Sequence, residues 1–317
     1  MKKIKNKKHR RKDLPFQQEF SGPLPDRRLM ERQIAEVHRL LEDRNFSSIK
    51  EANAFLEDYF RSNQPLTSPA PRTPLEEAQN LVYEALEKEA SAERIRLAQD
   101  AIRISPDCAD AYVLLAEEWS WDLQKTRRYY ELGMEAGERV LGAETFLEDA
   151  GHFWGRLETR PYMRARLGLA ETLWSLRRRK EAIDHLWDML RLNPGDNQGI
   201  RYALVHWLFE ENREKELAEL LERYPEEPTA TWSFTRALLS FRREGASERA
   251  NRELKNALKV NRFVMPYLLG KKGPPLEFPP SIGFGDETEA CDYVLGALWS
   301  WRSTEGAMDW LATVGRA

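Results

Sequence analysis

The chain has 317 residues, of which 41% are hydrophobic and 32% are charged, and its formal net charge is −3. Two cysteines are too few for a disulfide framework or a metal knuckle, and no run of eighteen apolar residues is present to span a membrane. The basic N-terminus lacks the apolar segment that follows it in a secretory signal, so we expect a cytoplasmic protein.

The first twelve residues are strongly basic. They hold eight lysine or arginine residues and no acidic residue, whereas residues 13–317 carry 41 basic and 52 acidic residues. We predict that residues 1–12 are a disordered tail, which either solubilises the chain or folds back on the acidic remainder. The alternative is a tail that contacts nucleic-acid or ribosomal phosphates, with an affinity that falls as salt rises. The residues that would make these contacts are Lys2, Lys3, Lys5, Lys7, Lys8, Arg10, Arg11 and Lys12.

Residues 13–63 predict an N-terminal helical segment. Helical spacing over 26–43 predicts one apolar face, made by Leu29, Ile34, Val37, Leu40 and Leu41. A second helix is expected over 48–61, with Ser47 as its N-cap and Glu51 placed to help cap the first turn. Residues 64–74 form a linker that cannot be helical, because it contains Pro65, Pro69, Pro71 and Pro74. The segment 13–63 either caps the stack that follows or occupies its groove.

From residue 75 to residue 317 the sequence predicts an all-α, tetratricopeptide-like solenoid. Two helices end in related phrases, Ala-Ile-Arg-Ile-Ser-Pro at 101–106 and Met-Leu-Arg-Leu-Asn-Pro at 189–194, and a new amphipathic helix follows each. Such a unit is a pair of helices closed by a proline, and neighbouring units must stack to bury their apolar faces. The residues at the aromatic, leucine and small positions of the pattern are Tyr112, Leu115, Ala116, Leu169, Ala170, Ala182, Leu186, Ala250, Leu254 and Ala257.

Two stretches interrupt the regular spacing. Pro106 and Pro194 are separated by about twenty residues more than two units of roughly 34 residues require. The glycine-rich stretch 133–161 is where we expect lengthened helices or an irregular crossover. A long loop is expected over 270–285, followed by a last pair of helices at 286–302 and 304–314.

Three blocks resemble the suppressor-of-tumorigenicity seven family. They are Ile-Ser-Pro-Asp-Cys-Ala-Asp-Ala-Tyr-Val-Leu-Leu-Ala-Glu-Glu at 104–118, Val-Met-Pro-Tyr-Leu-Leu at 264–269, and Gly-Asp-Glu-Thr-Glu-Ala at 285–290 leading to Trp-Arg-Ser-Thr-Glu-Gly-Ala at 301–307. The resemblance covers roughly residues 92–314 and implies a helical-repeat protein without an assigned enzymatic activity. Animal members carry N-terminal membrane segments, which we do not transfer to this chain. Residues 13–61 are similar to the leader of bacterial tetratricopeptide proteins, which favours a soluble bacterial relative.

The sequence predicts no enzyme, no cofactor and no metal site. Residues 270–273 lack the glycine spacing of a phosphate loop, and residues 282–285 are only a fragment of a dinucleotide fingerprint. The five histidines include no His-Glu-x-x-His pair, and neither cysteine has a histidine nearby in sequence to activate it. We therefore assign no catalytic residue.

The first helix of each unit is expected to face a concave groove. The repeat register places five residues in that groove, namely Arg164, Glu171, Trp174, Arg201 and Val205. Arg164, Arg201 and Trp174 could clamp an acidic segment or a C-terminal carboxylate beside an aromatic anchor. Alternatively, these residues pack against the next unit or against the helices of 13–61, and the tryptophans of first helices fill the space between units.

These observations favour a non-catalytic scaffold that binds a protein or peptide segment in the groove. The alternative is a nucleic-acid- or ribosome-associated protein that uses the basic tail, and a third class is the accessory subunit of an enzyme. A groove-binding scaffold should lose its partner on Arg164→Glu with Trp174→Ala and keep it without residues 1–12. The partner's identity and the oligomeric state stay open.

Overall fold

The computed structural model describes residues 26–42, 44, 46–62, 70–273 and 281–315. Within these ranges all regular structure is helical, as predicted. The basic tail 1–12, the proline-rich entry 13–25, most of the predicted linker and residues 274–280 lie outside the described residues. The helices are α1 (Arg27–Glu42), α2 (Ile49–Arg61), α3 (Pro74–Leu86), α4 (Ser91–Ile104), α5 (Ala109–Glu118), α6 (Leu123–Glu148), α7 (Arg160–Ser175), α8 (Arg179–Leu192), α9 (Ile200–Glu210), α10 (Glu214–Arg223), α11 (Ala230–Glu244), α12 (Glu248–Val260), α13 (Val264–Leu268), α14 (Glu287–Ser303) and α15 (Ala307–Val314).

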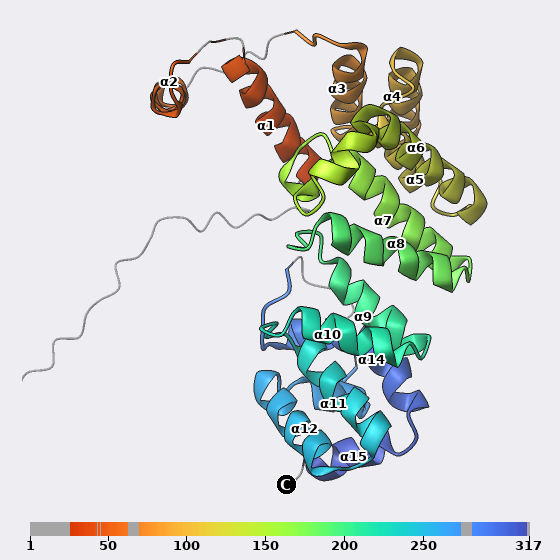
Figure 1. The fold of residues 1–317 in the computed structure, drawn as a ribbon. Coiled ribbons are helices and arrows are strands. Elements are labelled where there is room, and N and C mark those ends of the chain that lie inside the picture. The colour runs from red at the N-terminus through yellow and green to blue at the C-terminus, as the bar shows by residue number, and fades with distance from the viewer. Residues whose placement is uncertain (1–25, 43, 45, 63–69, 274–280, 316–317) are drawn as a thin grey trace, which may run out of the picture.

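Helices α3 to α12 form five successive pairs that stack into a helical-repeat array (Figure 1). The first helices of neighbouring units contact each other, α3 with α5 and α5 with α7. The small residues of the predicted repeat register, Ala170, Ala182, Ala250 and Ala257, have no exposed surface. Bulky side chains there would hold the two helices of a pair apart. The predicted repeat architecture is confirmed.

The extra residues between the two proline phrases lengthen α6 and form an irregular crossover. Helix α6 has 26 residues, and Gly142 interrupts it with φ 69° and ψ 162°. A glycine adopts this positive φ without the steric cost that a side chain brings. The short 3-10 turn η1 (Phe153–Gly155) follows, and its buried Phe153 packs against Phe146 and Tyr162. Both expectations for 133–161 are confirmed.

Two helix starts differ from the prediction. Ser48, not Ser47, is the N-cap of α2, and its hydroxyl accepts a hydrogen bond from the backbone N–H of Glu51 at 3.2 Å. The Glu51 carboxylate in turn accepts the N–H of Ser47 at 2.9 Å, so Ser47 is the residue before the cap. Pro74 belongs to α3 rather than to the linker, because proline fits the first turn of a helix capped by Thr73.

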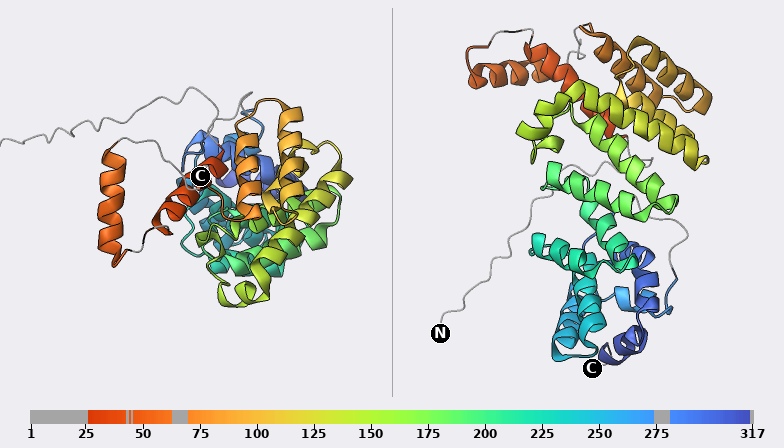
Figure 2. Two further views of the ribbon diagram at one scale, coloured as in Figure 1. Left: turned by 90° about the horizontal axis from the view of Figure 1, so that it is seen from above. Right: turned by 45° about the vertical axis from the view of Figure 1, so that its right-hand side comes forward.

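The C-terminal helices close the other end of the array. The predicted last pair is present as α14 and α15, and the short α13 before it was not predicted. Helix α14 packs against both α9 and α11, which are first helices of the last two pairs (Figures 1 and 2). Tyr293 of α14 lies between Phe234 of α11 and His206 of α9. The C-terminal half is therefore a closed bundle around one core.

His206 should make the stability of this bundle depend on pH. Burial lowers the pKa of His206 to about 4, below its ordinary value near 6.5. The neutral ring is favoured in the folded chain, so this contribution is complete above pH 6.5 and is lost as the pH falls towards 4. Because His206 is half-buried as a whole residue, we expect a loss of about 1–2 kcal/mol between pH 7 and pH 5.

Urea unfolding at the two pH values measures this effect. The comparison is with His206→Gln, whose side chain does not titrate. The variant should lose about 1–2 kcal/mol less than the wild type between pH 7 and pH 5. An equal loss in both chains would show that His206 is not the responsible group.

Candidate functional site

Helix α1 lies beside the first pairs of the stack (Figure 1). It packs on α3 and forms ion pairs with residues of α5 and α7. We call the surface that it covers the inner face, defined by Glu76 of α3, Asp110 and Glu117 of α5, and Arg160 and Arg164 of α7. Helix α2 stands away from the stack in every view and buries none of its residues (Figures 1 and 2). Within segment 13–63, α1 is therefore the part that contacts the stack.

Arg164 forms the centre of the inner face. Its Nε and Nη2 donate to the two carboxylate oxygens of Asp110 at 2.9 and 2.7 Å, and its Nη1 donates to both oxygens of Glu31 at 3.0 and 2.8 Å. Arg160 also donates to Glu31, at 3.2 Å, and Gln79 donates to Asp110 at 3.0 Å. One acid of α1 is thus shared by two arginines of α7.

Asp110 is a buried carboxylate without exposed surface. Burial alone would raise its pKa, but the adjacent Arg164 guanidinium outweighs burial and holds the pKa of Asp110 below its ordinary value. Asp110 therefore stays ionised, and its charge orients Arg164 towards α1. This fixed cation explains why an acidic residue of α1 lies at this point.

Further ion pairs extend along α1 on both sides of Glu31. They join Arg28 to Glu117 at 3.0 Å, Arg32 to Glu87 at 2.9 Å and Arg39 to Glu76 at 3.8 Å. The order of charges on the stack along α1 is therefore acid, two bases, then two acids. Helix α1 presents the complementary order, and this complementarity fixes its register on the inner face.

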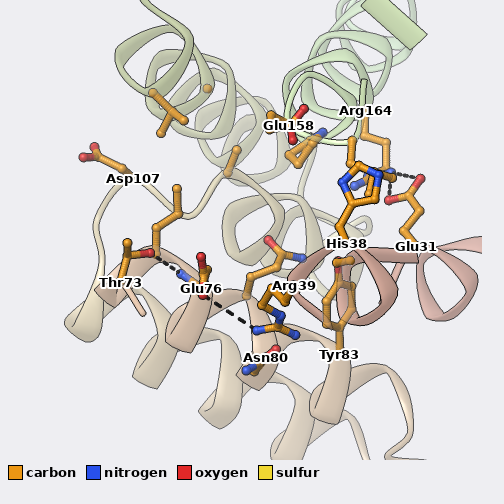
Figure 3. A pocket seen from close by; sticks show the side chains of 18 of the residues that line it. Glu31, His38, Arg39, Thr73, Glu76, Asn80, Tyr83, Asp107, Glu158 and Arg164 are labelled. Carbon is orange, nitrogen blue, oxygen red and sulfur yellow. Dashed lines mark hydrogen bonds and ion pairs between the residues drawn. The ribbon is translucent and has the colours of Figure 1, made fainter. Parts of the chain in front are cut away.

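A cavity of about 320 Å³ remains between α1, α3, α6 and α7. Figure 3 shows Glu31 with Arg164 at one end of it, and Arg39 with Glu76 between that end and Thr73. Its apolar wall comes from residues of the stack, and Ala35 is the small residue that α1 contributes. The apolar lining residues of the stack are Leu75, Tyr83, Ala109, Val140, Leu157 and Pro161.

The part of the chain that resembles known proteins is the stack, and α1 lies outside it. The family model described as ST7 protein matches residues 72–316. The chain belongs to the ST7 protein family. This confirms the resemblance that the three sequence blocks indicated. Helices α1 and α2 precede the matched region.

Curated members of the ST7 family are similar over the same part of the chain. The human suppressor of tumorigenicity 7 protein-like is 28% identical over 242 residues, which cover 69% of this chain and 42% of the human protein. The rat suppressor of tumorigenicity 7 protein is 27% identical over 66% of this chain and 40% of its own length. This ST7 family chain thus matches about two fifths of these relatives. The solved structure of YrrB, described as a TPR protein with an unusual peptide-binding site, is 16% identical, with a TM-score of 0.41 over 65% of this chain and 91% of YrrB.

The structure places the predicted groove residues in different surroundings. Arg164 lies on the inner face, where it already binds Asp110 and Glu31. Glu171 lies seven residues, or about two turns, further along α7. The residue as a whole is exposed, but neighbouring protein atoms partly desolvate its carboxyl and raise the pKa of that group. Trp174 stacks on Trp207 of the next unit, with ring centroids 4.4 Å apart. Trp174 of this ST7 family chain therefore fills space between two neighbouring units, as the second interpretation of these tryptophans expected.

Arg201 and Val205 do not join Arg164 in one open groove. Arg201 pairs with Asp196 at 3.0 Å and with Glu227 at 2.7 Å, so its guanidinium is held within its own unit. Val205 has no exposed surface and belongs to the core. The expectation that Val205 lines a partner groove is therefore wrong, because this side of α9 packs inward. The eight predicted nucleic-acid contacts in 1–12 lie outside the described residues.

Several residues of the inner face were not predicted from the sequence. Arg28, Glu31 and Arg39 are three of the four residues that α1 buries. They recur at helical spacing, which could have indicated a second, charged face on this helix. Their partners in α3, α5 and α7 lie far away in the sequence, so the ion pairs themselves had no local signal.

Both cysteines of this ST7 family chain are buried. Burial raises the pKa of the Cys108 thiol to about 12, which disfavours the reactive thiolate. Within the ranges that the structure covers, no three histidine, cysteine or acidic side chains cluster as metal ligands would. None of the helices described has both the length and the apolar character to cross a bilayer.

Proposed function

We propose that the chain is a non-catalytic scaffold that binds a helical segment of a partner protein on the inner face. The observation that carries the proposal is the position of α1, a helix that is held by ion pairs to three consecutive first helices. Stacked helical repeats present such extended surfaces to other chains. Arg164 provides a fixed donor fork for an acidic side chain of the partner.

Site-specific photo-crosslinking tests this proposal in cells. The crosslinking residue p-benzoylphenylalanine replaces Glu171, which is exposed on α7 beside the inner face. The matched control replaces Asp184, which is exposed on α8, the second helix of the same unit. We expect a discrete crosslinked protein from position 171 and none from position 184. Equal crosslinking at both positions, or none at position 171, would contradict partner binding at this face.

The same experiment separates the scaffold from the nucleic-acid alternative. That alternative depends on residues 1–12, which lie outside the described residues and whose role stays a prediction. The crosslinking is repeated in two ways. In the first the sample is treated with nuclease before it is analysed, and in the second the chain begins at Asp13. A scaffold keeps its crosslinked partner in both experiments, whereas a partner held through nucleic acid is lost, because phosphate contacts provide that affinity.

A further inference from the structure

Helix α1 turns a charged face to the stack and leaves apolar residues outside. It buries Arg28, Glu31, Arg39 and Leu40, whereas Met30 is 62% exposed and Ile34 is 43% exposed. A surface helix ordinarily does the opposite and places its apolar stripe against the core. Leu29, Val37 and Leu41 are half-buried, so the contact of α1 with the inner face combines partial apolar burial with a row of ion pairs.

The fit of α1 to the inner face is incomplete. Arg28 Nη1 and Arg39 Nε are buried, and neither has a hydrogen-bond acceptor in the described part of the chain. Buried donors without acceptors disfavour the bound state, because they lose their hydrogen bonds to water and form none with the protein. The cavity lies beside Ala35, whose single methyl group leaves its apolar wall partly uncovered. A better-matched helix could therefore bind this face more tightly than α1 does.

The chain allows α1 to leave without disturbing the stack. Residues 43–73 separate α1 from α3, and α2 within this segment buries none of its residues. Release of α1 thus exposes the inner face and breaks no core packing of the repeats. The family match begins at residue 72, so α1 is also outside the part of the chain that defines the family.

We propose that α1 is a displaceable occupant of the inner face and that the partner is an amphipathic helix of related pattern. That helix carries a basic residue to meet Glu117, an acidic residue three positions later to meet Arg160 and Arg164, and a large apolar side chain four positions after the acid. The third feature enters the cavity where α1 has only Ala35. This inference rests on the proposed function, because it names the partner chemistry and the regulation of the same face.

Synthetic peptides of residues 26–42 are the probes, labelled with fluorescein and followed by fluorescence anisotropy. Their affinity is measured for three versions of the full chain, namely the wild type, Glu31→Arg and Glu36→Arg. Glu31→Arg places a third cation beside Arg160 and Arg164 and should release α1. Glu36 pairs only with Arg32 of α1 itself among the described contacts, so Glu36→Arg is the matched control.

We expect the wild-type peptide to bind the Glu31→Arg chain at least tenfold more tightly than it binds the wild-type chain. The tethered α1 competes at an effective concentration on the order of millimolar, and the substitution removes this competitor. The Glu36→Arg chain should behave as the wild type. A peptide with Ala35→Leu should bind the Glu31→Arg chain about threefold to tenfold more tightly than the unchanged peptide, and a peptide with Glu31→Arg should not bind.

Amide hydrogen exchange shows directly whether α1 is released. Its amides should exchange at least tenfold faster in the Glu31→Arg chain, while those of α5 and α7 keep their protection. If Glu31→Arg perturbs the stack, Glu31→Gln keeps the shape of the side chain and should raise peptide affinity by a smaller factor, about threefold.

Two outcomes would overturn the inference. Either α1 stays protected in the Glu31→Arg chain, or the peptide fails to bind a chain whose α1 exchanges freely. Neither outcome decides the proposed function, which the crosslink at position 171 tests with cellular partners and without these peptides. If a partner is crosslinked at position 171 but the peptide does not bind, the proposed scaffold function stands and the inference that α1 competes with the partner is wrong.

Discussion

Replacing Arg164 with alanine should lower the free energy of unfolding by about 3–5 kcal/mol. The substitution leaves the carboxylate of Asp110, which has no exposed surface, with Gln79 as its remaining side-chain hydrogen-bond partner among the described contacts. An ionised group buried without its counter-ion keeps the desolvation cost and loses the compensating attraction. Chemical denaturation at pH 7, followed by far-ultraviolet circular dichroism, measures the loss.

The double variant Asp110→Ala with Arg164→Ala is the control for this expectation. It removes both charges, so it should be more stable than Arg164→Ala alone, although it has lost one side chain more. If the double variant is destabilised by the sum of the two single losses, the buried ion pair is not the cause. Such additivity would instead assign the effect of Arg164 to packing.

The pH dependence of the difference gives an independent check. In the wild type Arg164 lowers the pKa of Asp110, so this pair stabilises the fold above the unfolded pKa near 3.9 and the contribution is lost as the pH falls below it. Without Arg164, burial is opposed only by Arg28 and Gln79, so the pKa of Asp110 rises and the carboxyl takes up a proton at a higher pH in the folded variant than in the wild type. The deficit of Arg164→Ala should therefore shrink between pH 7 and pH 5.

The repeat architecture could be predicted because its determinants are local and recurrent. The prolines at 106 and 194 end helices, and small residues such as Ala182 and Ala250 occur where the helices of a pair approach. Gly142 and the neighbouring glycines likewise indicated where the regular spacing fails. Family membership followed from the same blocks, because they lie within the stack that the family model matches.

The site could be predicted only in part, because its contacts join distant segments. Arg164 was assigned to the inner side of α7 from its register, but Glu31, its partner, precedes it by 133 residues. Apolar spacing in α1 predicted one apolar face, and the structure turns the charged face to the stack because Arg160 and Arg164 attract Glu31. Val205 was misplaced for a related reason, since register alone does not show that this side of α9 is buried.

Gly137→Val should separate α6 from α7 and cost about 2–3 kcal/mol of stability. A Cβ atom at Gly137 would lie 2.8 Å from the Cβ atom and 3.2 Å from the Cα atom of Tyr162. The backbone of α7 cannot rotate away from such a contact as a flexible side chain can. Gly155→Val is the matched control, because nothing lies within 4 Å of a Cβ atom there and the residue is exposed.

The effect of Gly137→Val should reach the inner face, because Tyr162 lies between Arg160 and Arg164 on α7. A shift of this helix away from α6 moves both arginines relative to Asp110 and Glu31, and charged hydrogen bonds weaken steeply once their geometry is lost. Hydrogen exchange of α1 should therefore accelerate in Gly137→Val and stay unchanged in Gly155→Val. A destabilised stack with an unchanged α1 would show that the close approach of α6 and α7 supports the fold without setting the spacing of the ion pairs.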